Sequence, residues 1–375
     1  MCIFAHNARV CADCVAMDIE LFREILNIDS TSGNEAALAD FLAERLLTPY
    51  CRVEKFDVGD GTSNLLLSWG TPRIVFCSHL DTVPPYIPPV FGEDSVKGRG
   101  SCDAKGQIFA MYEACKVLES KGYDGFGLLL LAGEETGSFG AKAFRQQHPG
   151  AEWVIVGEPT DNCMASASKG TKSFEVTFEG KAFHSGYPQY GLSAIEMFND
   201  FVNALRSIVF PMDEVLGETT WNIGKLVSDN PQNILSDRLT CRVYFRTTFE
   251  SDEMVSNVMK NIAGEGAKLR FGRRRVQDGS DIVAKETAQW QRAMSVKAFG
   301  GDSPTRYEVL EGFPAKPVAF GSDAPQLTNF RKKILCGPGS ILVAHRPEEH
   351  ILLSDIGTAV ENYVRMYETL ITRSE

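Results

Sequence analysis

Residues 73–81, "RIVFCSHLD", are an apolar run that ends in a histidine and an aspartate. Residues 104–122 then carry apolar side chains at helical spacing, and residues 125–135, "GFGLLLLAGEE", are apolar again. Residues 139–149 and 151–159 repeat this alternation of helix and strand. Strands that are apolar on both faces and alternate with helices are typical of a mostly parallel sheet. The stretch therefore predicts an α/β fold in which helices sandwich that sheet.

The preceding residues extend the same domain. Residues 17–28 and 35–46 show helical spacing of apolar side chains and predict two helices. Residues 51–58 and 63–70 predict two strands that can pair as a hairpin. Residues 1–16 lack any periodicity, and we expect a disordered N-terminal extension there.

The pattern changes near residue 170. Phe174, Val176 and Phe178 alternate as one face of a strand, and residues 193–208 predict a long helix. Further strands and a second helix follow, which together predict an inserted α+β domain with an antiparallel sheet and two helices. The expected domains are a catalytic domain at residues 17–169 and 281–375, and an inserted lid or dimerisation domain at residues 170–280.

The charge composition restricts the classes of partner. The 375 residues include 38 Lys and Arg against 49 Asp and Glu, which gives a formal charge of −11. This charge disfavours a nucleic acid or an anionic membrane as partner, and favours a small-molecule substrate. We expect the basic run at residues 270–275 to be a solvated face. The apolar run at residues 127–133 is shorter than the roughly 20 residues that span a membrane.

The cysteines and the start of the chain bear on the compartment. Ten cysteines without regular spacing indicate no disulfide framework, and no charged-then-apolar signal segment comes before the first predicted helix. We therefore expect a cytoplasmic protein. Cys11 and Cys14 form an isolated CxxC, which we interpret as a chance spacing, not a zinc or redox pair.

Polar side chains gather at the ends of the predicted strands and in two loops. Because ligands of such sheets lie at the carboxyl ends of the strands, we expect these side chains to lie together. Massed carboxylates repel one another and need counter-charge, which a divalent metal supplies. Two histidines with three acids suit two zinc ions, or cobalt or manganese, that share a bridging carboxylate. The residues are His79, Asp103, Glu134, Glu135, Glu158 and His345.

Six motifs carry a resemblance to a known family. In chain order they are "SHLDTVP", "GRGSCDAKG", "GEETGSFGAK", "VGEPT", "FHSGYPQYG" and "GPGSILVAHRPEEH". In this order they resemble the M20 family of co-catalytic metallopeptidases and deacylases, specifically its branch of acetylornithine deacetylases and succinyl-diaminopimelate desuccinylases. The resemblance extends from about Met17 to the C-terminus, and it implies a zinc-exopeptidase-like fold.

The resemblance also implies a role for each residue of the predicted cluster. His79 and Glu158 would hold one metal ion, Glu135 and His345 would hold the other, Asp103 would bridge them, and Glu134 would be the general base. It further implies a cis peptide bond between Asp103 and Ala104.

Elementary chemistry supports the roles of Glu134 and Asp81. A carboxylate beside a metal-activated water can take its proton and later give it to the leaving amine, which suits Glu134. Residues i and i+2 of an extended segment share a face. The carboxylate of Asp81 can therefore hydrogen-bond the far nitrogen of His79 and fix its tautomer.

The inserted domain offers residues for substrate contact. In the resembling family the positions of His184, Tyr187, Asn233 and Arg246 polarise the scissile carbonyl or grip the substrate carboxylate. Ordinary sheet and interface packing is the alternative, and "NILS" replaces the family's N-x-x-P at Asn233. Lys169, Gly321 and Ser322 are expected to border the pocket. The resemblance implies that His184 acts in the site of a partner subunit, so we expect a homodimer built through the inserted domain.

These observations predict a hydrolase that cleaves the amide bond of an N-acyl amino acid, with acetylornithine as the first substrate hypothesis. A desuccinylase, dipeptidase or carboxypeptidase on the same scaffold is the alternative. A metal-free binding relative is a further alternative, which is disfavoured because every ligand position and the base are filled.

Overall fold

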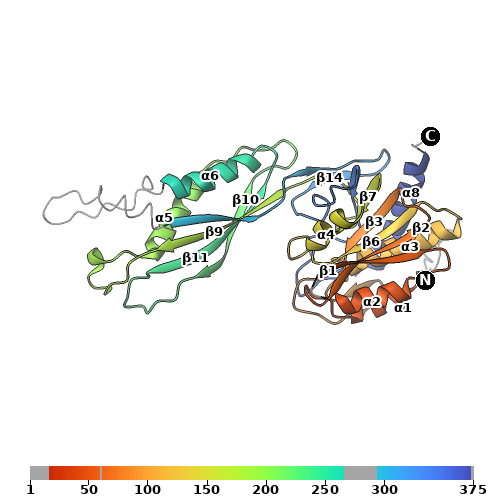
Figure 1. The fold of residues 1–375 in the computed structure, drawn as a ribbon, viewed down its shortest axis with the longest axis horizontal. Helices are drawn as coiled ribbons and strands as arrows, with labels where there is room; N and C mark the ends of the chain where they lie inside the picture. The colour runs from red at the N-terminus through yellow and green to blue at the C-terminus, as the bar shows by residue number, and fades with distance from the viewer. Residues whose placement is uncertain (1–16, 60, 266–293, 373–375) are drawn as a thin grey trace, which may run out of the picture. The chain divides into compact units, whose positions relative to one another are not determined.

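The computed structural model describes residues 17–59, 61–265 and 294–372. The predicted N-terminal extension with its CxxC, and the basic run at residues 270–275, lie outside these residues. The chain divides into two compact units (Figure 1). The first contains the residues up to Ala165 together with Tyr307–Lys316 and Ser322 onward, and the second contains Ser166–Arg306 and Pro317–Gly321.

The first unit is built on a six-stranded sheet with the order β1-β2-β6-β3-β7-β15. Strands β6, β3, β7 and β15 are parallel, whereas β1 and β2 pair as the predicted antiparallel hairpin at one edge. The strands are β1 (Arg52–Gly59), β2 (Thr62–Trp69), β3 (Ile74–His79), β6 (Phe126–Leu131), β7 (Trp153–Val156) and β15 (Lys332–Leu335). The predicted α/β fold is confirmed.

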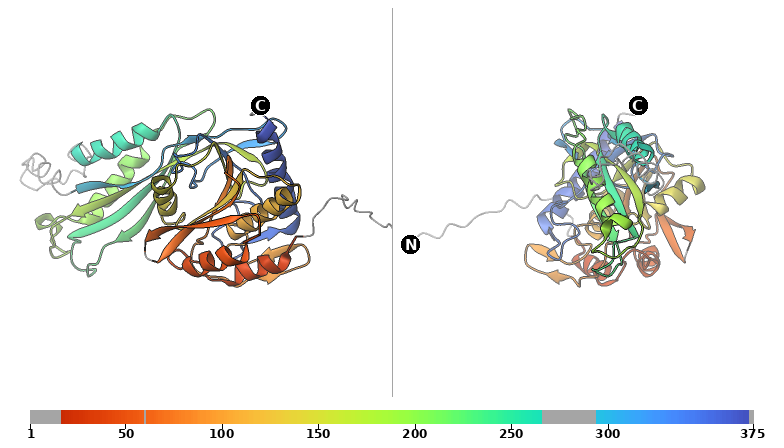
Figure 2. Two further views of the ribbon diagram at one scale, coloured as in Figure 1. Left: turned by 45° about the vertical axis from the view of Figure 1, so that its right-hand side comes forward. Right: turned by 90° about the vertical axis from the view of Figure 1, so that its left-hand side faces the viewer.

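Helices cover both faces of this sheet. On one face, alternate residues of β2 and β3, such as Leu67 and Phe76, join a core with helices α3 and α8, which pack side by side (Figure 2). On the other face, Phe144 of α4 packs edge-on against Phe56 of β1, with ring centroids 5.1 Å apart. The helices are α1 (Ile19–Asn27), α2 (Ala36–Arg45), α3 (Lys105–Ser120), α4 (Phe139–Gln147) and α8 (Leu353–Thr372).

The described residues form two further small sheets, besides the main sheet of each unit. One joins β4 (Val90–Phe91), β5 (Ser95–Lys97) and β16 (His350–Leu352). The other joins β8 (Met164–Ser168), β13 (Thr305–Arg306) and β14 (Ala315–Val318), where the chain passes from one unit to the other. No helix among the described residues is long and apolar enough to cross a bilayer.

The second unit has a four-stranded antiparallel sheet with the order β10-β11-β9-β12. Phe174, Val176 and Phe178 of β9 are buried, as their alternation predicted, in a core that α5 and α6 cover on one face (Figure 1). The elements are β9 (Gly170–Glu179), η1 (Pro188–Tyr190), α5 (Ala194–Arg206), β10 (Thr220–Val227), β11 (Arg238–Thr247), α6 (Asp252–Glu265) and β12 (Met294–Gly300).

The boundaries of this unit differ from the expected residues 170–280. Strand β12 pairs with β9, so the unit continues to Arg306. Residues Pro317–Gly321 also belong to it. This last strand, β12, lies beyond the basic run at residues 270–275, after which the sequence reading ended the inserted domain.

Candidate metal centre

The parallel strands deliver polar side chains to one edge of the first unit's sheet. His79 is the last residue of β3, Glu134 and Glu135 lie in the turn after β6, and Glu158 follows β7. Asp103 lies just before α3, and its peptide bond to Ala104 is cis, as predicted. Because parallel strands end at a common edge, residues from distant parts of the sequence meet there.

Four of the predicted ligands contact one another directly. Asp103 Oδ1 lies 3.1 Å from His79 Nε2, and Asp103 Oδ2 lies 3.3 Å from His345 Nε2. His345 Nε2 also lies 2.8 Å from Glu135 Oε1. One ligand atom each from His79, Asp103 and Glu135 lie within 4.8 Å of one another. The two oxygens of one buried carboxylate therefore face two different imidazoles.

Glu158 and Glu134 lie in the electrostatic environment of this cluster. Burial raises the pKa of Glu158 well above its usual range, and repulsion from Asp103 and Glu134 adds to the effect. Burial likewise raises the pKa of Glu134, whereas the charge of nearby His79 acts to lower that pKa. Among the described residues, the group of mutually close ligand atoms does not include Glu158. The predicted membership of Glu158 in the cluster thus rests on its position at the strand end and on its electrostatic interaction with Asp103 and Glu134.

The histidines supply positive charge to these acids. Burial opposes protonation of His79, yet hydrogen bonds with Asp103 and Asp81 hold its pKa well above its usual range. Hydrogen bonds with Asp103 and Glu135 raise the pKa of His345 to about 10. Burial acts to raise the pKa of Asp103, yet hydrogen bonds with His345 and His79 hold it well below its usual range. Divalent cations could replace these protons, since imidazole and carboxylate donors fit zinc, cobalt or manganese.

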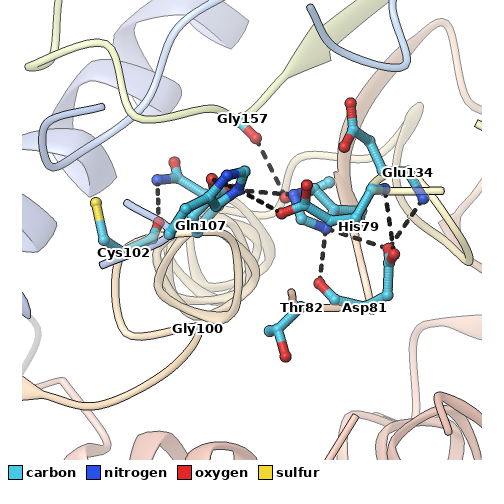
Figure 3. A network of polar contacts seen from close by, with 12 residues as sticks. His79, Asp81, Thr82, Gly100, Cys102, Gln107, Glu134 and Gly157 are labelled. Atoms are coloured by element: carbon cyan, nitrogen blue, oxygen red, sulfur yellow. Dashed lines mark hydrogen bonds and ion pairs between the residues drawn. The ribbon is translucent and has the colours of Figure 1, made fainter. Parts of the chain in front are cut away.

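Asp81 orients both His79 and the turn that carries Glu134 (Figure 3). The nearest partner of His79 Nδ1 is the backbone carbonyl of Asp81 at 2.8 Å, and the carboxylate oxygen Oδ1 lies farther away, at 3.4 Å. The predicted orienting contact is thus made mainly by the main chain. The carboxylate instead accepts hydrogen bonds from the backbone N–H groups of Glu134 at 2.9 Å and Glu135 at 3.2 Å, and from the Ser32 hydroxyl at 2.8 Å.

Asn64, in the middle of β2, is a positioning residue that the sequence reading missed. Its side chain is fully buried, donates to the carbonyl of Gly140 at 2.9 Å and accepts from the N–H of Ala132 at 2.9 Å. These two groups are the ends of the turn that carries Glu134 and Glu135. Asn64 thus closes the turn, and an amide directly before the apolar run Leu65–Leu67 was the signal that could have indicated it.

Gly133 begins the same turn and requires its glycine. Its φ is +66°, and a Cβ there would lie 1.6 Å from the ring of Phe139. Left-handed backbone is accessible to glycine without steric cost. The ring of Phe139 therefore packs directly on the main chain that precedes Glu134.

Five candidate substrate residues of the second unit form two groups. His184, Tyr187 and Asn233 lie together: Ser185 N–H donates to the carbonyl of Asn233 at 2.9 Å, and the rings of His184 and Tyr187 are 5.9 Å apart. All three residues are exposed.

Arg246 and Gly321 form the second group. A Cβ at Gly321 would lie 3.7 Å from Arg246 Nη1. Lys169, also in the second unit, donates through Nζ to the carbonyl of Glu218. Ser322 belongs to the first unit, where it is buried and accepts a hydrogen bond from the N–H of Ala324 at 3.3 Å. Within the second unit the candidates thus lie in separate places, and Ser322 directly follows Gly321 in the chain.

Comparison with known proteins identifies the family. Residues 75–369 match the family described as peptidase family M20/M25/M40. A peptidase M20 domain-containing protein of Schizosaccharomyces pombe is 32% identical, over 93% of this chain and 83% of its own length. A probable carboxypeptidase of Aspergillus clavatus is 30% identical, over 95% of this chain and 89% of its own length.

Solved structures share the fold. A tripeptidase of Staphylococcus aureus superposes with a TM-score of 0.72 at 19% identity, covering 92% of this chain and 95% of its own. The YXEP protein of Bacillus subtilis, described as a dinuclear metal binding peptidase from the M20 family, gives 0.64 at 12% identity and covers 92% of this chain and 95% of its own. The chain therefore belongs to peptidase family M20/M25/M40, which makes it a hydrolase.

Proposed function

We propose that this protein is a dinuclear metal-dependent hydrolase that cleaves an amide bond whose nitrogen belongs to an amino acid with a free carboxylate. The observation that carries the proposal is the pair of Asp103 oxygens that face His79 on one side and His345 on the other. A carboxylate that bridges two metal ions needs this arrangement. The description of the Bacillus subtilis relative as dinuclear supports it.

The assignment of ligands follows the resemblance, and the contacts of Asp103 with both histidines and of His345 with Glu135 support it. His79 and Glu158 would hold one ion and Glu135 and His345 the other, with Asp103 shared between them. Two bound divalent ions would polarise the scissile carbonyl and make water more acidic. Zinc is the first choice for this donor set, with cobalt and manganese as substitutes.

Glu134 would be the general base. Its main chain is fixed by Asp81, and its raised pKa suits a carboxylate that takes a proton from water and later donates it to the leaving nitrogen. Asp81 would keep the ring of His79 in one orientation and would hold the turn of Glu134 at a fixed position relative to that ring.

The second unit would supply the substrate contacts. His184 would stabilise the developing oxyanion from a partner subunit, which requires a homodimer through this unit. Arg246 would bind the substrate carboxylate, because a guanidinium matches a carboxylate with two parallel hydrogen bonds. Tyr187, Asn233, Lys169, Gly321 and Ser322 would line the remainder of the pocket.

The substrate class covers two named activities. A peptide with a free C-terminus and an N-acetyl amino acid both contain an acyl group on the nitrogen of an amino acid. The relatives named as carboxypeptidases support the peptide, and the short motifs "VGEPT" and "SDAP" favour N-acetylornithine. We give the peptide priority, because those relatives match nearly the whole chain.

The experiment is a substrate panel. Zinc-loaded protein would be offered dipeptides, N-acetyl amino acids including acetylornithine, and N-succinyl-diaminopimelate, with released amine measured by ninhydrin. Amine release that disappears after chelation of the metal is expected for at least one class. No release from any member would overturn the proposed reaction.

A further inference from the structure

Arg99 and Glu349 form a buried ion pair that contacts the loop of Asp103. Arg99 is 2% exposed and Glu349 is fully buried. Arg99 Nη1 donates to Glu349 Oε2 at 2.5 Å. The proposed reaction uses neither side chain, although both lie in motifs that carry ligands: "GRGSCD" contains Asp103, and "HRPEE" begins with His345.

The second oxygen of Glu349 holds the loop that carries Asp103. Glu349 Oε1 accepts hydrogen bonds from the backbone N–H groups of Gly100 at 2.9 Å, Cys102 at 3.1 Å and Asp103 at 3.1 Å. Gly100 and Cys102 can be followed in Figure 3. One of these donors is the main chain of Asp103 itself, so Glu349 fixes the point from which the Asp103 side chain leaves the backbone.

Arg99 ties two further loops to the same point. Its Nε donates to the carbonyl of Pro85, six residues after His79, at 3.3 Å. Its Nη1 also donates to the carbonyl of Arg346, the residue after His345, at 3.4 Å. The ion pair is therefore the common anchor of three loops, those that carry His79, Asp103 and His345.

We propose that the Arg99–Glu349 pair is a positioning device that sets the separation of His79 and His345 across Asp103. The proposal rests on the proposed function, since it assigns the pair to the geometry of a dinuclear site. A carboxylate oxygen can accept from several N–H groups at one point, and the planar guanidinium of Arg99 can donate to a carboxylate and to two carbonyls together in a fixed geometry. Apolar residues of similar size could fill the space but could not orient these loops.

The test compares three variants of the full-length protein. Glu349→Gln keeps an acceptor for the three N–H groups but removes the charge that faces Arg99. Glu349→Leu removes every acceptor. Glu348→Gln is the matched control, because this neighbouring side chain is 72% exposed and its ion pair with Arg346 is 3.8 Å long. The dissociation constant for Zn²⁺ is measured by competition with a chromophoric chelator, well below each melting temperature.

We expect Glu349→Gln to weaken Zn²⁺ binding by about 10- to 100-fold, the range seen when the partners that orient metal ligands are replaced. Glu349→Leu should weaken it further, and Glu348→Gln should leave it unchanged. A purely structural role would lower the melting temperature of Glu349→Gln without changing its Zn²⁺ affinity. That result would overturn the proposal, and it can be read even if Glu349→Leu does not fold.

A second measurement separates this proposal from the proposed function. Hydrogen exchange of the metal-free protein should be faster in residues 98–104 of Glu349→Gln than in the unchanged protein or in Glu348→Gln. If the unchanged protein binds no Zn²⁺, the proposed function fails while the exchange rates still show whether Glu349 holds the loop. Unaltered exchange in residues 98–104 contradicts the anchoring itself.

Discussion

The metal cluster of the first unit and the His184 loop of the second unit hold their polar side chains very differently. His79 and Asp103 are 1% and 5% exposed, and each has several fixed partners. His184 is exposed, and its ring accepts one local hydrogen bond, from the N–H of Gly186 at 3.0 Å. The side chains of the cluster are therefore held by fixed protein contacts, whereas the His184 side chain is held mainly by its own loop.

His345 lies between these extremes and sharpens the contrast. Its side chain is 49% exposed and its backbone has a φ of +63°. It nevertheless contacts two acids, the buried Asp103 and the mostly buried Glu135. Preorganisation in the first unit thus comes from the loops that carry the ligands as much as from the burial of each ligand.

The largest effect is expected from a substitution of Glu134. This substitution should lower turnover and leave metal binding by the cluster intact. Glu134→Gln should lower turnover by at least about 10²- to 10⁴-fold, because a general base acts on the proton and does not hold the ions. Its zinc content, measured by elemental analysis, should remain that of the unchanged protein. Glu135→Gln is the control and should lose zinc. Loss of zinc from Glu134→Gln instead would mean that the roles of the two residues are exchanged.

A smaller loss is expected from the exposed loop. His184→Ala should lower turnover by about 10²- to 10³-fold, because the proposed donor to the oxyanion is removed. Zinc content and melting temperature should be unchanged, since the side chain is exposed and not part of the cluster. Mixing His184→Ala with Glu134→Gln should restore activity if the histidine acts in the partner's site. Demonstrated subunit exchange without any recovery would contradict that role.

A substitution of Asp81 tests how far the metal cluster depends on the hydrogen bonds that position its loops. Asp81→Asn places an amide where two backbone N–H groups now donate, and it should weaken Zn²⁺ binding or turnover by about 10- to 100-fold. Asp40→Asn is a suitable control, because that carboxylate is 74% exposed and pairs with Lys55 at the surface. Equal Zn²⁺ affinities and turnover rates for the two variants would show that the contacts of Asp81 with the Glu134 turn do not matter.

Asn64 should have the smallest effect, on stability. Asn64→Ala leaves the N–H of Ala132 and the carbonyl of Gly140 without their buried partner, which should lower the free energy of unfolding by about 1–3 kcal/mol. Denaturant unfolding measures this, with Asn222→Ala, an exposed asparagine of β10, as the matched control. An unfolding free energy equal to that of the control would show that the hydrogen bonds of Asn64 do not stabilise the turn that carries Glu134 and Glu135.

Periodicity and strand ends were sufficient to predict most of the first unit. The alternation in residues 73–159 predicts the parallel strands β3, β6 and β7, and the carboxyl ends of those strands bring His79, Glu134, Glu135 and Glu158 to one edge. The burial of Phe174, Val176 and Phe178 followed from their spacing in the same way. These features depend on hydrophobic burial, which leaves a repeating pattern in the sequence.

The residues that were missed act through contacts without any local pattern. Glu349 and Gly100 are 249 positions apart, and Asn64 and Gly140 are 76 apart. Polar pairs of this kind form only once the fold has brought their loops together. The same reason explains Asp81, whose main contacts are with the distant main chain of Glu134 and Glu135 instead of with the neighbouring histidine ring.

The central claim is that Asp103 bridges two metal ions, and metal stoichiometry tests it most directly. Metal-depleted protein would be titrated with Zn²⁺ and its bound zinc counted per chain, in parallel with Asp103→Ala. The account predicts two zinc ions per chain in the unchanged protein, and loss of tight binding at both positions when the shared carboxylate is removed. A single ion in the unchanged protein, or two ions that Asp103→Ala retains with undiminished affinity, would contradict it.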